Sequence, residues 1–335
     1  MLGNRDGLRI VSLIPSATEI VSALGYGDYL VGRSHECDFP ASVQTLPICT
    51  EPKFDPDGSS RQVHERVTEL LSVALSVYRV DVELLAKLRP THIITQAQCE
   101  VCAVSLSDVE QAVATLGEAG EPPIEIVSLQ PVCLADVWTD MQRVSAALSV
   151  YSTPDRDVAQ NKTLDSDLNS SAQGLINGLK ARLPSSSVTQ STEKSHSENR
   201  PKVVCIEWTD PLMAAGNWVP ELVALAGGED VCGQAGQHSD WMSWEALSAA
   251  DPDIIVVIPC GYDLAQTRQA TKEMSTHAAW PKLSAVKSGQ VYLTDGNQYF
   301  NRPGPRLVDS YEILAEIIQG RTVDSNRNSV GWERF

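Results

Sequence analysis

The chain has 335 residues, of which 42% are hydrophobic, so it is long enough for two domains of ordinary size with substantial cores. Its formal net charge of -17 argues against nucleic acid and anionic membranes as partners, because both require a concentrated basic patch. No apolar run reaches the roughly 18 residues that a membrane-spanning helix needs, so we predict no membrane insertion.

The amino-terminal residues, Met1 to Gly7, lack the features of a secretory signal. A signal needs a basic start, an apolar stretch and a small-residue cleavage site. We therefore expect a cytoplasmic protein, with a periplasmic location as the alternative if an export leader was removed. Eight cysteines fit the first expectation, because a large chain without a leader usually keeps its thiols reduced.

The predicted elements begin with a short β-branched strand, Leu8 to Leu13, which is followed by a turn and a helix. Ser16 and Glu19 have the spacing of a capping box that would open this helix, and Gly25 can close it. From Leu134 onward, apolar residues fall at helical spacing without proline or glycine. This pattern predicts a rigid amphipathic helix that connects two lobes.

Strands and helices alternate along the chain, and two helix–proline–strand patterns lead into His92–Gln96 and Asp253–Ile258. The other predicted elements are the strands Leu30–Gly32, Val203–Glu207 and Gln290–Thr294 and the helices Ala172–Leu183, Pro220–Ala226 and Arg306–Gln319. We predict an α/β fold of two Rossmann-like lobes with mostly parallel sheets, joined by a long rigid α-helix, with a ligand cleft between the lobes. The predicted domains are an amino-terminal lobe over residues 8–130, a connecting helix and extension over 131–183, a polar flexible loop over 184–202 and a carboxyl-terminal lobe over 203–320.

Candidate binding residues follow the predicted strands, because open α/β sheets bind ligands beyond the carboxyl ends of their strands. Tryptophans concentrate in the second lobe, where they suit a large flat ligand, although core packing is the alternative for each one singly. The candidate ligand-binding residues are Ser16, Thr18, His35, Glu36, Gln96, Glu207, Trp208, Trp218, Trp241, Tyr299, Phe300 and Arg302.

Four cysteines at the ends of predicted strands are candidate metal ligands. Cys99 and Cys102 form a C-x-x-C pair, and Cys37 and Cys260 follow other strands. A single C-x-x-C is a weak signal for zinc or an iron–sulfur cluster, and reduced thiols beside the ligand are the alternative. The sequence contains no G-x-S-x-G elbow, phosphate-binding loop or H-E-x-x-H motif. It therefore favours a ligand-binding protein, with a cytoplasmic metalloprotein or enzyme on the same scaffold as the rival.

Several motifs resemble those of a known family. The segment Arg9–Glu19 resembles the opening of substrate-binding proteins for vitamin B12, haem and iron–siderophore importers. Five more segments resemble the subgroup labelled cobalamin-binding: Ser34–Pro40, Cys99–Val104, Gly216–Leu222, Pro259–Tyr262 and Tyr299–Arg306. The resemblance covers nearly all of residues 8–320 outside the polar loop, and it implies two lobes joined by one long helix.

The resemblance also implies that the chain binds cobalamin, a related corrinoid or tetrapyrrole, or another metal chelate and passes it to an ABC permease. We expect Ser16 and Thr18 to supply polar anchors at a helix amino terminus, and the aromatic candidates to supply apolar walls. Arg302 could pair with a carboxylate or phosphate, and His35 could be an axial ligand to cobalt or iron.

Overall fold

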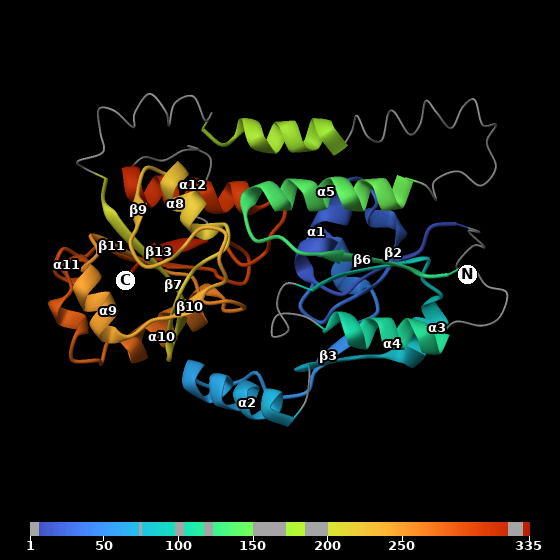
Figure 1. Ribbon diagram of the computed structural model, residues 1–335, viewed down its shortest axis with the longest axis horizontal. Helices are drawn as coiled ribbons and strands as arrows, with labels where there is room; N and C mark the ends of the chain where they lie inside the picture. Colours follow the sequence, from blue (N-terminus) through green and yellow to red (C-terminus); the bar gives the residue numbers. More distant parts are fainter. Residues whose placement is uncertain are drawn as a thin grey trace. The chain divides into compact units, whose positions relative to one another are not determined.

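A computed structural model provides the structure of the chain and describes residues 7–73, 76–97, 104–116, 123–149, 172–184, 200–320 and 331–335. The chain divides into two compact units (Figure 1). Unit 1 consists of Met1–Asp57, Glu65–Pro131 and Ala135–Gly178, and unit 2 consists of Gly58–His64, Val132–Leu134 and Leu179–Phe335. Within these described ranges, no helix is long and apolar enough to cross a membrane.

Unit 1 contains a four-stranded, fully parallel sheet in the order β2-β1-β5-β6. Its strands are β1 (Ile10–Ser12), β2 (Leu30–Arg33), β5 (His92–Gln96) and β6 (Glu125–Leu129). Every residue of β1 and β5 is buried, as expected for strands covered on both faces. The predicted parallel α/β arrangement is therefore confirmed in this unit.

Helices cover both faces of this sheet. On one face, Leu85 of α3 and Val109 of α4 pack against Val11 and Ile93; α1 and α5 lie on the other (Figure 1). The helices that begin in this half of the chain are α1 (Pro15–Ala23), α2 (Ser60–Val73), α3 (Val82–Leu88), α4 (Leu106–Leu116) and α5 (Leu134–Ser149), with 3-10 turns η1 (Gly27–Tyr29) and η2 (Ala41–Thr45). A two-stranded antiparallel sheet, β3 (Thr50–Pro52) with β4 (Tyr78–Val80), was not predicted.

The start of α1 differs from the predicted capping box. Pro15 is the first helical residue and Ile14 is the N-cap, without a side-chain cap bond. Proline suits the first helical position because its fixed φ matches the helix and its missing N–H needs no partner there. Ser16 consequently lies inside the helix and cannot cap it, so the capping-box prediction was wrong; Gly25 does follow the helix, with φ +86°.

Unit 2 contains a mixed sheet in the order β10-β8-β7-β11-β12-β13, with β9 also paired to β7. The strands are β7 (Lys202–Thr209), β8 (Leu212–Ala214), β9 (Glu229–Asp230), β10 (Asp240–Trp241), β11 (Ile254–Val257), β12 (Val291–Thr294) and β13 (Trp332–Arg334). The central strands β7, β11 and β12 are parallel as predicted. The strands β8 and β10 on one side of these central strands, and β13 on the other, pair antiparallel. They were not predicted, because the alternation of strands and helices along the sequence does not indicate them.

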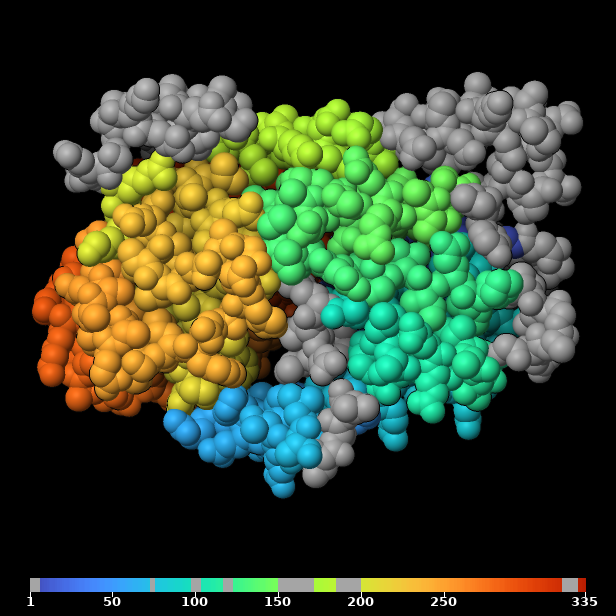
Figure 2. Space-filling view, viewed as in Figure 1, coloured from blue at the N-terminus to red at the C-terminus, as the bar shows by residue number. Residues whose placement is uncertain are grey.

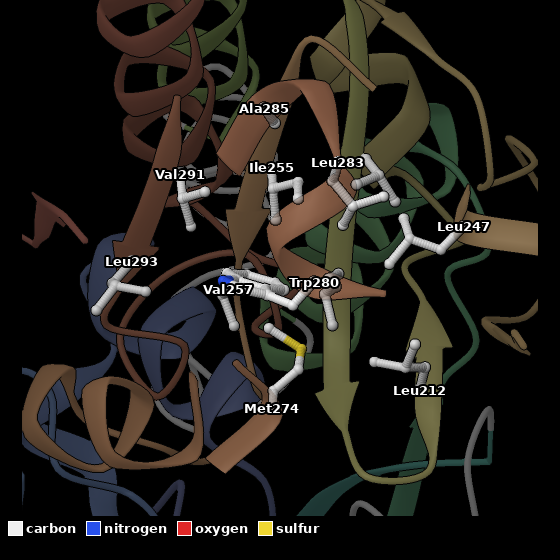
Figure 3. Packing of buried hydrophobic residues seen from close by; sticks show 12 residues of the cluster. Leu212, Leu247, Ile255, Val257, Met274, Trp280, Leu283, Ala285, Val291 and Leu293 are labelled. Carbon is white, nitrogen blue, oxygen red and sulfur yellow. The ribbon is translucent and has the colours of Figure 1, made fainter. Parts of the chain in front are cut away.

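A hydrophobic core lies against one face of this sheet (Figure 3). Leu247, Met274 and Trp280 pack onto Ile255 and Val257 of β11, so α9, α10 and η3 cover this face; α8 and α12 pack together on the other (Figure 1). The helical elements are α8 (Val219–Leu225), α9 (Trp244–Ala250), α10 (Leu264–Met274), η3 (Trp280–Lys282), α11 (Ser284–Lys287) and α12 (Leu307–Gln319). The stretch that carries α9, coloured yellow to orange, lies at the surface of unit 2 (Figure 2).

The predicted amphipathic helix is present as α5, which spans 16 residues and begins at the boundary of the two units. Leu134 belongs to unit 2 and Ala135 to unit 1. A further helix over residues 172–181 also crosses a boundary, between Gly178 and Leu179. Most of the predicted polar loop, residues 185–199, lies outside the described residues.

Candidate ligand-binding site

In unit 1, a buried hydrogen-bond chain connects the end of β1 to the segment after β2. The Thr18 hydroxyl lies 2.8 Å from Ser12 Oγ and 3.0 Å from Cys37 Sγ, and the Ser12 hydroxyl donates to the Ile14 carbonyl. Thr18 and Cys37 are each 1% exposed. The Thr18 hydroxyl therefore satisfies its hydrogen bonds inside the unit, where it orders the carboxyl end of the sheet.

Ser16 and Gln96 are also buried near the carboxyl ends of β1 and β5. Among the described residues, Ser16 Oγ has no hydrogen-bond partner. The segment that follows β5 includes Cys99 and Cys102, which lie outside the described residues. Ser16 remains a candidate polar anchor, although its own exposure is only 1%.

His35 and Glu36, the predicted polar residues after β2, are both partly exposed. Its Nδ1 lies 2.8 Å from Thr50 Oγ1, which also accepts a hydrogen bond from the His35 backbone N–H. Its ring packs against that of Tyr78 with centroids 5.1 Å apart, and the Tyr78 hydroxyl donates to Glu36 Oε1. The two-stranded sheet of β3 and β4 thus orients both predicted residues, His35 and Glu36.

The opposite ring nitrogen of His35, Nε2, lies 4.0 Å from Glu36 Oε1, and the His35 side chain is 24% exposed. Burial lowers the pKa of His35, the Arg33 guanidinium lowers it further, and Glu51 opposes both. The imidazole is consequently neutral near pH 7. When its proton is on Nδ1, facing Thr50, the Nε2 lone pair is available to a metal.

In unit 2, Glu207 lies near the carboxyl end of β7 and is fixed by a neighbouring loop. The Ser239 hydroxyl donates to Glu207 Oε2 at 2.8 Å, and the same hydroxyl accepts from the Gly216 N–H at 3.0 Å. The Glu207 carbonyl accepts from the Cys260 N–H. These bonds connect the ends of β7, β8 and β11 through one carboxylate residue.

An aromatic pair lies beside Glu207. The rings of Trp208 and Tyr262 have centroids 5.3 Å apart, and the Ser60 hydroxyl lies 2.7 Å from Thr209 Oγ1 and 3.5 Å from Tyr262 Oη. Trp208 Nε1 is buried and has no hydrogen-bond partner among the residues that the structure describes. Trp208 is therefore at the predicted edge of the sheet, together with Ser60, which the sequence did not indicate.

The first turn of α2 contributes to unit 2 in the same place. Arg61 donates two hydrogen bonds to Asp210, at 2.8 and 2.6 Å, and the His64 ring contacts Trp241 edge-on with centroids 5.1 Å apart. Trp241 is 54% exposed, so its ring is available to a ligand. The residues that sequence reasoning missed here are Ser60, Arg61 and His64, whereas Asp210 and Tyr262 follow predicted strands.

Trp218 and Phe300 occupy the interior of unit 2. Trp218 Nε1 donates to the Phe300 carbonyl at 2.7 Å, and the Phe300 N–H donates to Ser310 Oγ. Phe300 is fully buried and Trp218 is 5% exposed, so neither ring presents a surface to a ligand. These two residues match the alternative of core packing.

Tyr299 and Arg302 belong to the loop after β12. Tyr299 is half-buried, and the Arg306 guanidinium lies over its ring, 5.7 Å from the centroid. Arg302 is 5% exposed and donates to Asn297 Oδ1 at 2.8 Å. Arg302 therefore helps to order this loop, whereas Tyr299 offers part of its ring to the surroundings.

The predicted thiolate metal site gains no support. Among the described residues, no three His, Cys, Asp or Glu side chains are grouped as a metal site. Burial raises the pKa of Cys37, although the hydrogen bond from Thr18 opposes this, so its thiol stays protonated. Cys260 is half-buried and reduced.

Comparisons with known proteins agree with the fold. A family described as periplasmic binding protein matches residues 164–298. The chain is 25% identical over 320 residues to an uncharacterized ABC transporter substrate-binding lipoprotein, YvrC, of Bacillus subtilis, covering 94% of this chain and 81% of the relative. It is 24% identical over 322 residues to a vitamin B12-binding protein of Vibrio cholerae, covering 93% and 89%.

A solved structure matches over nearly the same range. The periplasmic heme-binding protein RhuT from Roseiflexus sp. RS-1, in its apo form, has a TM-score of 0.62 at 20% identity, covering 94% of this chain and 98% of that one. At this identity the likeness shows the fold alone. None of these relatives supports the expected cytoplasmic location. The motifs between Arg9 and Arg306, the parallel strands of both units and the similarity over nearly the full length agree, and the chain resembles substrate-binding proteins of ABC importers with the periplasmic-binding fold.

Proposed function

We propose that the chain reversibly binds a corrinoid, a related tetrapyrrole or another metal chelate at the carboxyl ends of its strands and delivers it to an ABC permease. Two relatives support this ligand class by their names, a vitamin B12-binding protein and a heme-binding protein. A relative that is a lipoprotein supports a location outside the cytoplasm. No covalent step is required, since such a protein binds and releases its cargo unchanged.

The observation that carries this proposal is the environment of His35. Its Nδ1 faces Thr50 at 2.8 Å, its ring packs on Tyr78, and burial favours the neutral form. A neutral imidazole whose second nitrogen is oriented by a neighbour is a suitable ligand for cobalt or iron. We propose that His35 Nε2 occupies an axial position of the bound metal.

Unit 2, considered by itself, offers a second candidate surface for a flat ligand. Trp241 is 54% exposed and braced by His64, and the half-buried Tyr299 is flanked by Arg306. Flat macrocycles gain affinity from such rings through apolar area and stacking. Trp208 Nε1, which is buried and has no partner among the described residues, is proposed to donate to a polar group of a ligand at this surface of unit 2.

Visible spectra and calorimetry of the full chain with aquacobinamide and with haemin test this proposal. Both ligands have an open axial position, so ligation by imidazole changes their spectra. His35→Ala should abolish the spectral change and weaken binding at least about tenfold, or about 1.4 kcal/mol. Thr50→Val should weaken it less, by the roughly 0.5–1.5 kcal/mol of one hydrogen bond.

His277→Ala is the matched control, because His277 is an exposed histidine that stacks on Trp244 and is unrelated to the strand ends. Its spectra and affinity should equal those of the unmodified chain. Absence of binding to either ligand at about 100 μM, equivalent to roughly 5 kcal/mol, would overturn the ligand class. Binding that His35→Ala leaves unchanged would overturn the role of His35 alone.

A further inference from the structure

Residues 331–335 lie along the outer edge of β12 in unit 2. Strand β13 pairs antiparallel with β12, with Tyr292 opposite Arg334, Leu293 opposite Glu333 and Thr294 opposite Trp332. Backbone bonds continue beyond the strand at both ends: the Asp295 N–H donates to the Gly331 carbonyl and the Phe335 N–H to the Val291 carbonyl, each at 2.9 Å. The segment therefore pairs with β12 over its whole length.

The side chains on one face of this segment contact α10 and η3. Glu333 accepts two hydrogen bonds from the Arg268 guanidinium, at 2.6 and 2.5 Å, and this interaction raises the pKa of Arg268. The Phe335 ring meets Trp280 edge-on, with centroids 6.2 Å apart. Because side chains alternate along a strand, residues 333 and 335 share this face.

The other face contacts α12 and β12. Trp332 Nε1 donates to Glu316 Oε2 at 3.0 Å, and its ring meets Tyr292 with centroids 5.6 Å apart. The Arg334 guanidinium lies 5.8 Å from the Tyr292 ring centroid, and its Nε donates to the Gly289 carbonyl at 2.6 Å. Each of the four side chains from 332 to 335 consequently has a specific partner in unit 2.

We propose that the β12 edge is a strand-accepting site for an extended segment with an aromatic–acidic–basic–aromatic pattern, and that residues 331–335 occupy it. Strand addition derives affinity from backbone pairing and specificity from pockets for alternate side chains, and both are present here. A strand of three residues is too short to be stable by backbone pairing alone. Side-chain contacts with Arg268, Glu316, Tyr292 and Trp280 must therefore add to the stability of the pairing, and they also supply its specificity.

Occupancy of this edge also positions the loop after β12. Gly331 has φ +93°, and a Cβ at this position would overlap the Tyr299 ring. Its carbonyl accepts from the Asp295 N–H, at the start of the loop that carries Tyr299. The bound segment thus packs directly against Tyr299, which follows the carboxyl end of β12 and is also a proposed ligand contact.

Amide hydrogen exchange of the full chain, read in peptides covering residues 290–296 and 331–335, tests the site. Glu333→Arg and Arg268→Glu should each speed exchange in both peptides by about tenfold, because each juxtaposes like charges in place of the paired ones. The double charge swap should restore slow exchange. Glu273→Arg, an exposed charge reversal on α10, is the control and should change neither peptide.

A peptide with the sequence of residues 331–335, added at millimolar concentration, should restore slow exchange over residues 290–296 in Glu333→Arg. This concentration matches the effective concentration of a segment joined by a short linker. The same peptide with Arg at the Glu333 position should not. The proposal is overturned if Glu333→Arg leaves exchange over 290–296 unchanged, if the charge swap does not restore it, or if the added peptide gives no protection.

Discussion

The His92 imidazole illustrates how a single buried group makes stability depend on pH. Its side chain is fully buried at the amino end of β5, with Nδ1 2.9 Å from Thr91 Oγ1 and Nε2 3.4 Å from Glu125 Oε2. Burial lowers the pKa of His92, while Glu125 and the backbone carbonyl of Ala147 oppose this. The folded protein therefore holds His92 neutral at a pH where the unfolded chain binds a proton.

We expect stability to fall as the pH decreases through about 6.5, the pKa of histidine in an unfolded chain. Above that pH the residue is neutral in both states; below it, protonation favours the unfolded state. From pH 7.5 to 5.5 the loss from this residue is at most about 1.4 kcal/mol. Urea unfolding at both pH values should show a smaller difference in His92→Gln, whereas His277→Gln should match the unmodified chain. An equal difference in His92→Gln would contradict this interpretation.

The sequence located polar residues at strand ends but could not tell which of them stay accessible. Thr18 satisfies its hydroxyl within the Ser12–Cys37 chain, and Phe300 is fully buried. Both outcomes depend on neighbouring residues that the fold brings together from distant parts of the sequence, and no local sequence pattern indicates these neighbours. Ser60 shows the same limit, since it meets Thr209 across 149 positions of sequence.

At the scale of elements, the start of α5 depends on a residue from another helix. The Leu134 N–H, at the first turn of α5, donates to Glu221 Oε2 of α8 at 2.8 Å. A carboxylate at this place satisfies one of the unpaired N–H groups of a helix start and interacts favourably with the helix dipole. Both residues belong to unit 2, although α5 continues into unit 1.

Glu221→Gln should lower the free energy of unfolding by about 0.5–1 kcal/mol, because it keeps an acceptor oxygen but removes the negative charge. Glu221→Ala should cost more, about 1–2 kcal/mol, since the acceptor is lost as well. Denaturant unfolding measures both values, with Glu110→Gln, an exposed residue of α4, as the control. If Glu221→Ala proved no more costly than Glu110→Gln, the carboxylate would not stabilise the helix start.

Elements with strong hydrophobic patterns were predictable, and short strands without such a pattern were not. The strand His92–Gln96 and the start of α5 at Leu134 were predicted to the residue, and α12 to within one residue, because apolar or periodic segments determine them. Strands β3, β8, β10 and β13 have two or three residues each, too few for periodicity to appear. Their positions depend on pairing with distant strands, which the sequence alone does not specify.

At the scale of the whole molecule, each unit has a core of its own. Val11, Ile93 and Val109 belong to the core of unit 1, whereas Ile255 and Leu293 belong to that of unit 2. Motif resemblance predicted this two-lobed α/β architecture over nearly the whole chain, because a fold is shared by all sequences that preserve the same buried positions. The ligand is less predictable, since it depends on a few side chains whose surroundings differ among relatives.

Separate cores predict that a cavity in one unit loosens that unit preferentially. Ile93→Ala and Leu293→Ala each remove a fully buried side chain, one from β5 and one from β12, and should each cost about 2–5 kcal/mol. In amide hydrogen exchange, Ile93→Ala should speed exchange in β1, β5 and β6, and Leu293→Ala in β7, β11 and β12, because local openings follow cooperative units of structure. The costs should add within about 0.5 kcal/mol in the double variant, since the two sites share no core residue. Faster exchange throughout both units in either single variant would mean that the chain opens as one cooperative unit, and the two cores would then be coupled through the segments that cross their boundaries.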